Sequence, residues 1–157
     1  MKSIINLIIS IAVFLFAVFI AGATEIDIVL KAVVLAFTIQ WVAFLPAYIF
    51  QTEKFYDLTG SLTYLTVMWY ALALTSNHFS DVSISNITIV LLITIWALRL
   101  GSFLFMRIHK DGEDKRFRSI KPSPSQFFMT WTLQGLWVSL CSMCALTAIS
   151  SEPGVVI

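Results

Sequence analysis

The chain reads ITIVLLITIWALRLGSFLFM from Ile87 to Met106, and Arg107 follows directly. A helix needs about 20 predominantly apolar residues to cross the hydrocarbon core of a bilayer, and this stretch supplies them. Arg99 is its only charged residue and lies roughly 12 Å deeper along the helix than Arg107, at 1.5 Å per residue. An arginine near mid-depth costs about 2.5–3.5 kcal/mol on an insertion scale. The stretch therefore predicts a spanning helix in which Arg99 is a candidate site residue.

The composition places the whole chain in the same class. Hydrophobic residues make up 59% of the 157 residues, charged residues only 12%, and the mean hydropathy is +0.89. Soluble domains are about 25% charged, so we expect most of this surface to face the lipid bilayer. Backbone groups cannot stay unpaired in lipid, so the fold class is expected to be all-α, a polytopic transmembrane helix bundle. Residues 1–157 are expected to form a single transmembrane helical domain.

Five apolar stretches are long enough to be spanning helices. They cover residues 3–21, 27–50, 57–75, 86–106 and 124–149. The first is too long and too uniformly apolar for a signal peptide, and no A-x-A cleavage pattern follows it, so it is expected to be an anchor helix. The last is preceded by a helix-start signal, in which Ser123 caps and Pro124 takes the first helical position.

Positive charge falls in alternate connections between these stretches. The connections 22–26 and 76–85 contain no Lys or Arg, whereas Lys2 precedes the first stretch and Lys54 precedes the third. The loop 107–121 holds six basic residues, namely Arg107, Lys110, Lys115, Arg116, Arg118 and Lys121. Cytoplasmic loops carry such an excess. The pattern predicts a cytoplasmic N-terminus and a cytoplasmic 107–123 loop.

This basic loop has two interpretations. It is either a solvated topology signal or an anion site, in which Arg107, Arg116 and Arg118 bind phosphates bidentately. In the second case three carboxylates hold the arginines or contact a ribose, and Gly112 permits a tight turn; the carboxylates are Asp111, Glu113 and Asp114. The net charge of the loop is only +3, from six basic and three acidic residues, which argues against nucleic acid as a partner.

The third stretch carries a polar face. Asp57, Ser61 and Tyr64 follow one another at i, i+4 and i+7, on one side of a helix. Asp57 either caps the helix or pairs with Arg99, because each is the nearest unmatched charge for the other. Tyr64 is expected to donate a hydrogen bond into a buried apolar site. We take Asp57 and Tyr64 as the catalytic candidates.

No metal site is expected. Cys141 and Cys144 form a C-x-x-C pair, but no second pair completes a zinc site, so both are interpreted as small packing residues. His78 and His109 fall in opposite loops and cannot share a metal.

Three motifs together suggest a family. Residues 55–61 read FYDLTGS, residues 96–101 read WALRLG, and residues 107–116 follow the pattern R-x-x-x-x-G-E-D-x-R. From about residue 28 to 150 the chain resembles a bacterial membrane family of unknown function that is related to the steroid 5-alpha-reductases. The isoprenylcysteine carboxyl methyltransferases are more distant relatives.

The resemblance implies an integral protein of the bacterial inner membrane that holds NADPH on its cytoplasmic side. It implies reduction of an activated carbon–carbon double bond in a small apolar substrate, lipid-like or steroid-like. On the matching positions of this chain, the resemblance implies that Arg99, Arg107, Asp114 and Arg116 lie near the cofactor. Arg118 of the basic loop is a further candidate for binding it. The alternatives are a methyltransferase that uses S-adenosylmethionine and a non-enzymatic membrane protein in which Arg99 and Asp57 form a structural pair.

Two features depart from that family. Its members usually continue into a second cytoplasmic motif, Arg-His-Pro-Asn-Tyr, so this chain is expected to be the N-terminal part of a longer reductase-like protein. Steroid reductases also carry a Glu before a Leu-Pro pair, where it polarises the enone. The similar place here reads Phe44-Leu45-Pro46 and lacks that acid.

The first prediction concerns topology. The loop 107–123 should lie in the cytoplasm and the connection 76–85 outside, because the loop arginines all lie on one side. A cysteine introduced at Gly112 should therefore stay unlabelled by a membrane-impermeant reagent in intact cells. Labelling of that cysteine would overturn the topology.

Overall fold

The computed structural model describes residues 2–75 and 83–151. Within these ranges the chain is all-helical, as predicted. The helices are α1 (Lys2–Gly22), α2 (Asp27–Ile49), α3 (Tyr56–Thr75), α4 (Ile84–Asp111) and α5 (Pro124–Ser150), with a short 3-10 helix, η2 (Lys115–Arg118), before α5. Each α-helix covers one of the five predicted stretches, but α4 continues to Asp111, so residues 107–111 of the predicted loop are its last turns. Ser123 stands at the N-cap of α5 as expected, but its side chain makes no capping hydrogen bond.

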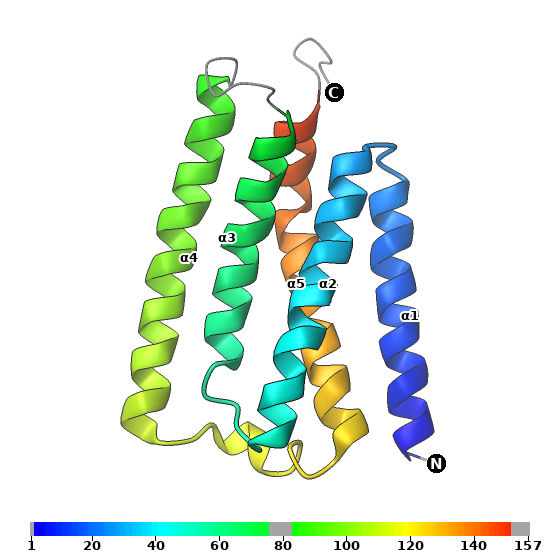
Figure 1. Cartoon of the computed structure of the whole chain (residues 1–157), viewed down its shortest axis with the longest axis vertical. Helices are drawn as coiled ribbons and strands as arrows, with labels where there is room; N and C mark the ends of the chain where they lie inside the picture. Colours follow the sequence, from blue (N-terminus) through cyan, green and yellow to red (C-terminus); the bar gives the residue numbers. More distant parts are fainter. Residues whose placement is uncertain (1, 76–82, 152–157) are drawn as a thin grey trace.

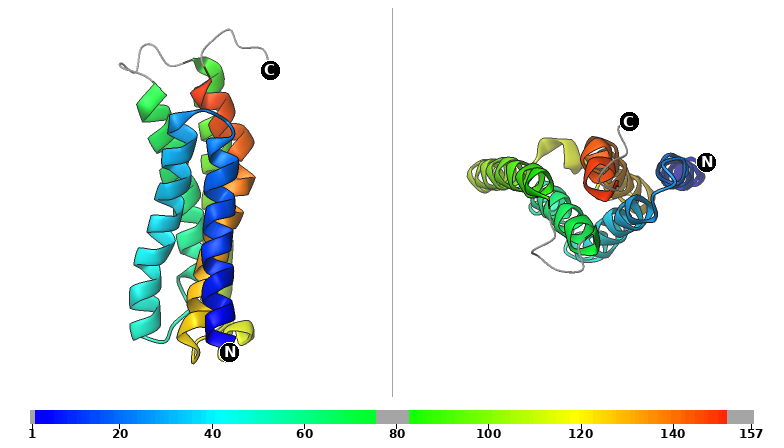
Figure 2. Two further views of the ribbon diagram at one scale, coloured as in Figure 1. Left: turned by 90° about the vertical axis from the view of Figure 1, so that its right-hand side faces the viewer. Right: turned by 90° about the horizontal axis from the view of Figure 1, so that it is seen from above.

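The helices run side by side along one long axis (Figure 1). Seen from above, α4, α3, α2 and α1 follow a V-shaped path, and α5 lies within it against α1, α2 and α3 (Figure 2). The start of α1, the α2–α3 connection and the basic loop all lie at one end of the bundle. This grouping is the one that the charge pattern requires, while the side of the membrane stays a prediction. The predicted outer loop, 76–85, falls outside the described residues except for 83–85.

Within the described residues, four helices are long and apolar enough to cross a membrane, namely α1, α2, α4 and α5. Large apolar side chains such as Phe19 of α1 and Leu92 of α4 are exposed. In a bilayer these side chains face lipid, so the exposed apolar surface is that of an integral membrane protein. Cys141 and Cys144 are also exposed on α5, so neither is buried in the core of the bundle.

Helix α3 differs from the other four, because its composition is too polar for a span by the same measure. Its Thr59, Ser61 and Thr63 are buried, since α3 packs against α2, α4 and α5. Buried Gln40 of α2 donates to Thr63 Oγ1 at 2.9 Å, which satisfies one of these hydroxyls across a helix interface. All five predicted helices are therefore present, but α3 is less apolar than the prediction of five membrane spans assumed.

Glycines set how closely the helices approach. A Cβ added at Gly101 of α4 would lie 2.8 Å from Ser61 Cβ of α3. A Cβ at Gly135 of α5 would lie 3.0 Å from the ring of Phe37 on α2. Small residues at such crossings let two backbones approach closely, which is how helices gain contact in a membrane.

The second prediction follows from Gly101. Replacing it with Val should destabilise the bundle by about 1–3 kcal/mol, the usual range for overpacking, because Ser61 leaves no room for the side chain. Thermal unfolding in detergent would measure the loss. Gly22→Ala is the matched control, since nothing lies within 4 Å of an added Cβ there. Equal stability of the two variants would contradict the close contact.

Candidate functional site

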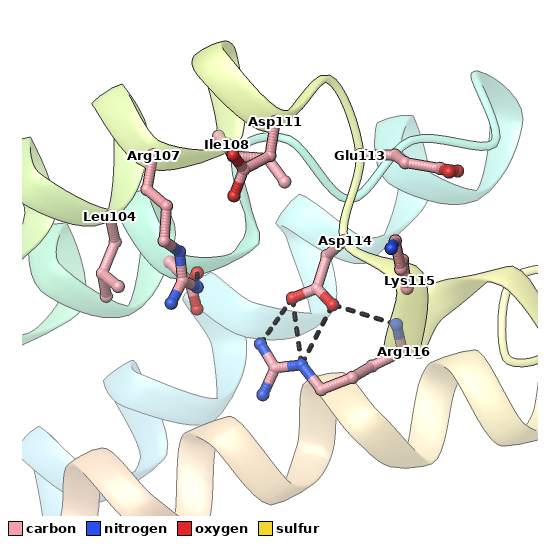
Figure 3. A pocket seen from close by; sticks show the side chains of 9 residues that line it. Leu104, Arg107, Ile108, Asp111, Glu113, Asp114, Lys115 and Arg116 are labelled. Carbon is pink, nitrogen blue, oxygen red and sulfur yellow. Dashed lines mark hydrogen bonds and ion pairs between the residues drawn. The ribbon is translucent and has the colours of Figure 1, made fainter.

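A cavity of about 800 Å³ opens at the end of the bundle that carries the basic loop (Figure 3). It lies between the first turn of α3, the last turns of α4 and the segment that contains η2. Three cations and four carboxylates line it, together with two apolar side chains. The full set is Asp57, Leu104, Arg107, Ile108, Asp111, Glu113, Asp114, Lys115 and Arg116. We call this space the outer cavity.

A second, smaller cavity of about 180 Å³ continues into the bundle between α3, α4 and α5. Asp57 and Leu104 line both spaces and so mark the junction between them. The other lining residues are mainly apolar or aromatic, namely Gly60, Ser61, Tyr64, Trp96, Leu100, Gln134, Trp137 and Val138. The rings of Tyr64 and Trp96 meet edge to face with centroids 5.1 Å apart. We call this space the inner cavity.

Local hydrogen bonds give the basic loop its shape. Gly112 follows α4 with a φ of 79°, in the left-handed region that favours glycine, which confirms the predicted turn. Asp114 then caps η2 by accepting from the Arg116 backbone N–H at 3.0 Å. Its carboxylate also accepts from Arg116 Nε at 3.0 Å. These side-chain hydrogen bonds hold the pKa of the Asp114 carboxyl below its usual range.

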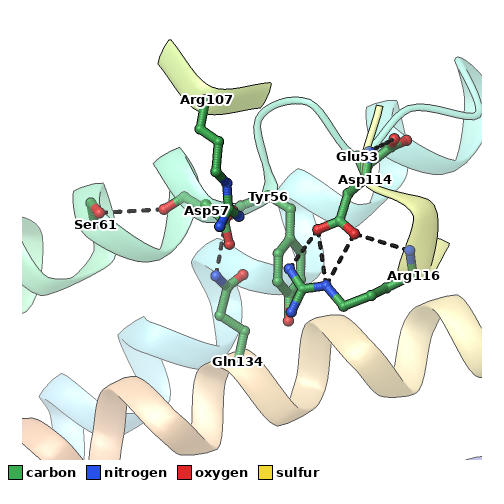
Figure 4. A network of polar contacts seen from close by, with 8 residues as sticks. All are labelled: Glu53, Tyr56, Asp57, Ser61, Arg107, Asp114, Arg116 and Gln134. Carbon is green, nitrogen blue, oxygen red and sulfur yellow. Dashed lines mark hydrogen bonds and ion pairs between the residues drawn. The ribbon is translucent and has the colours of Figure 1, made fainter. Parts of the chain in front are cut away.

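Glu53, which sequence reasoning did not single out, fastens this loop to the bundle. It lies in the α2–α3 connection and is only 5% exposed. Its Oε1 accepts from the Asp114 backbone N–H at 3.0 Å (Figure 4), and its Oε2 accepts from Lys121 Nζ at 2.6 Å. One buried carboxylate therefore connects two points of the loop. In the sequence, Glu53 is an acidic residue in a short connection predicted to lie on the same side of the membrane as the basic loop. The sequence does not indicate which residues of the loop it contacts.

The predicted pairing of Asp57 with Arg99 is wrong. Asp57 Oδ2 lies 3.8 Å from Arg107 Nη2 instead. Asp57 sits in the first turn of α3, at the loop end of the bundle, and Arg107 reaches the same depth from α4. Arg99 lies deeper and is exposed, whereas Ala97 and Gly101 occupy the buried side of α4.

The structure brings together four of the predicted site residues and separates three. Asp57, Arg107, Asp114 and Arg116 all line the outer cavity. Tyr64 lines only the inner cavity. Arg99 and Arg118 line neither cavity, and Arg118 pairs with Glu113. The expected restraint of arginines by interleaved carboxylates is confirmed for Arg116 and Arg118.

Gln134 of α5 is a second residue that the sequence did not indicate. Its Nε2 donates to the Tyr56 backbone carbonyl at 3.1 Å, and Tyr56 Oη donates to the Thr130 carbonyl at 3.0 Å. These two hydrogen bonds join α5 to the start of α3. They fix the wall of the inner cavity next to Asp57 (Figure 4).

The described residues thus define a helical membrane bundle with a charged cavity at one end and an apolar extension. The chain belongs to the family described as "Protein of unknown function (DUF1295)", whose match covers residues 43–157. Every residue that lines the two cavities falls within this range. The match confirms the predicted membership of a membrane family of unknown function; the relation to steroid reductases stays a prediction. No curated protein and no solved structure matches the chain.

The third prediction concerns Glu53. Glu53→Gln removes the charge that Lys121 faces and should lower stability by about 1–2 kcal/mol, near the range for a hydrogen bond to a charged group. Thermal unfolding and hydrogen exchange of the 112–121 amides would show the loss. Lys121→Met should cost less in the Glu53→Gln background than alone, because the two residues interact.

The control for this cycle is Glu113→Gln, which breaks an exposed ion pair with Arg118 and should change stability little. If the stability losses of the Glu53 and Lys121 substitutions simply add, the two residues do not interact and Glu53 does not hold the loop through Lys121.

Proposed function

We propose that this protein is an NADPH-dependent, membrane-embedded reductase that acts on an activated carbon–carbon double bond of a lipid-like substrate. The observation that supports this most is the junction of two unlike cavities at Asp57 and Leu104. The outer cavity is charged and opens at the bundle end, which suits a polar cofactor. The inner cavity is largely apolar, which suits a substrate dissolved in the bilayer.

The outer cavity fits a phosphorylated dinucleotide in size and donor set. Its volume of about 800 Å³ lies within the usual range of ligand pockets, about 300–1,000 Å³. Arg116 remains able to bind phosphate while it holds Asp114, because a guanidinium has five N–H donors. Among the described residues, Lys115 makes no ion pair. Asp111 and Glu113 are acceptors for ribose hydroxyls.

In this proposal, the role of each residue depends on its depth in the bundle. NADPH, when bound, supplies a hydride, and the reduced carbon's neighbour needs a proton. Asp57 is the acid–base candidate, because it is the titratable group at the junction where the two compartments meet. Arg107, 3.8 Å away, orients that carboxylate. Tyr64 lies deeper and would orient the substrate through its hydroxyl.

One observation favours a second candidate. Four carboxylates line the outer cavity against three cations, and this balance suits a cationic cofactor better than an anionic one. S-adenosylmethionine carries a positive sulfonium group, so a methyltransferase is the alternative function. A non-enzymatic role would leave both cofactors unbound.

The fourth prediction separates these functions. Calorimetry on the intact protein in nanodiscs should detect binding of NADPH. Arg116→Ala should weaken NADPH binding by about 1.5–3 kcal/mol, the range for a charge-assisted hydrogen bond, and leave NADH nearly unchanged, because only NADPH carries the 2′-phosphate.

Lys110→Ala is the control, since Lys110 is a cation at the same end of the bundle but lines neither cavity, and its loss should leave NADPH affinity unchanged. Binding of S-adenosylmethionine in place of NADPH would favour the methyltransferase. Binding of neither cofactor, or an Arg116→Ala variant with normal NADPH affinity, would contradict the proposed reductase.

A further inference from the structure

Helix α4 stands at one end of the V-shaped path of helices and packs mainly against α3 (Figure 2). Its buried residues share one face, and they are Val90, Ala97, Gly101 and Ile108. The opposite face is exposed, and its residues follow one another at alternating steps of four and three, namely Thr88, Leu92, Ile95, Arg99, Ser102 and Met106. This alternation is typical of the seam between two packed helices. We call this set of residues the outward stripe.

Arg99 lies on this stripe and near the middle of the bilayer. The apolar stretch 87–106 fills a hydrocarbon core about 30 Å thick, and Arg99 lies roughly 4 Å from the midpoint of that stretch at 1.5 Å per residue. Helical side chains lean toward the N-terminus of their own helix. For α4 that end is the one away from the basic loop, and it lies about 22 Å further along the axis. The guanidinium is therefore held within the hydrocarbon core.

Arg99 has no partner in the part of the chain that the structure describes. Within residues 2–75 and 83–151 its side chain makes no ion pair and no hydrogen bond, unlike those of Arg107, Arg116 and Arg118. In the same ranges the Ser102 hydroxyl, one turn away on the stripe, also makes no hydrogen bond. A charged residue at this depth is costly unless it is paired. Two such donors on one lipid-facing stripe call for an acceptor from outside these ranges.

A second copy of the chain does not supply this acceptor. The sequence has nine acidic residues, and none of them lies within an apolar stretch beyond its first residue. A symmetric pair of α4 helices would also place two Arg99 side chains at the same depth, where like charges repel. Lipid phosphate groups lie outside the hydrocarbon core. The acceptor must therefore belong to another membrane-spanning helix.

We infer that the outward stripe is a docking surface for a transmembrane helix that carries an Asp or Glu at mid-depth. A carboxylate can accept from the Arg99 guanidinium and from the Ser102 hydroxyl together, because it has two oxygens. Ser102 is small, so the two backbones can approach closely at this point. Leu92 and Ile95 on one side of Arg99, and Met106 on the other, supply the apolar part of the seam. This inference does not depend on the proposed reductase.

The fifth prediction uses two synthetic transmembrane peptides, each a Leu/Ala helix of about 20 residues with either Glu or Gln at its centre. The intact protein carries a fluorescent donor and each peptide an acceptor, so energy transfer in lipid vesicles reports association. The Glu peptide should associate about tenfold more strongly than the Gln peptide, the size expected for one polar contact between helices in a membrane. Arg99→Leu should reduce this ratio to about one.

Lys110→Leu is the matched control, because it removes an exposed cation of α4 that lies beyond the apolar stretch, and the ratio should stay unchanged. Equal association of the two peptides with the unaltered protein would overturn the inference, and so would a preference for Glu that survives Arg99→Leu. Energy transfer between two copies of the protein that is lost in Arg99→Leu would identify a second copy as the occupant and would overturn it as well. Because no cofactor is present, failure here is distinct from failure of NADPH binding.

Discussion

Helix α3 is too polar to face lipid over its whole surface, and the bundle is arranged to enclose it. Thr59, Ser61 and Thr63 are buried because α2, α4 and α5 each pack against α3. An unpaired hydroxyl in hydrocarbon would cost several kcal/mol, so these side chains bond to their own backbone or to a neighbouring helix. The close crossing at Gly101 allows α4 to cover this polar surface.

Enclosing α3 also creates both cavities. The first two turns of α3 present Asp57 and Ser61 at the loop end, and Tyr64 follows one turn deeper along the same face. Each cavity is bounded by that face, by α4 and by either the basic loop or α5. Helix α3, which is the helix least suited to lipid, therefore lines both the charged outer cavity and the largely apolar inner cavity. The charged outer cavity and the largely apolar inner cavity meet at Asp57 and Leu104.

A buried carboxylate, that of Glu53, helps to hold the basic loop in position, together with the buried ring of Phe117 in η2, which packs against Tyr56. Exposed ion pairs such as that of Arg118 with Glu113 contribute little by themselves. Glu53 differs, because it is buried and binds both a backbone N–H and an ammonium group. It holds the segment that carries Asp114 and Arg116 against the α2–α3 connection. Since Asp114 and Arg116 line the outer cavity, this contact also holds that wall of the cavity in place.

The sequence by itself determined the helices and the grouping of the ends. Apolar stretches of spanning length must satisfy their own backbone, so the positions of the helices could be predicted, and the glycine turn and the arginine–carboxylate clusters are local in sequence. Tertiary structure alone decided the partners of Asp57 and the roles of Glu53 and Gln134. Those depend on the depth at which each side chain lies and on which face of a neighbouring helix meets it. Periodicity along one helix fixes neither, which is why Arg107 rather than Arg99 lies beside Asp57.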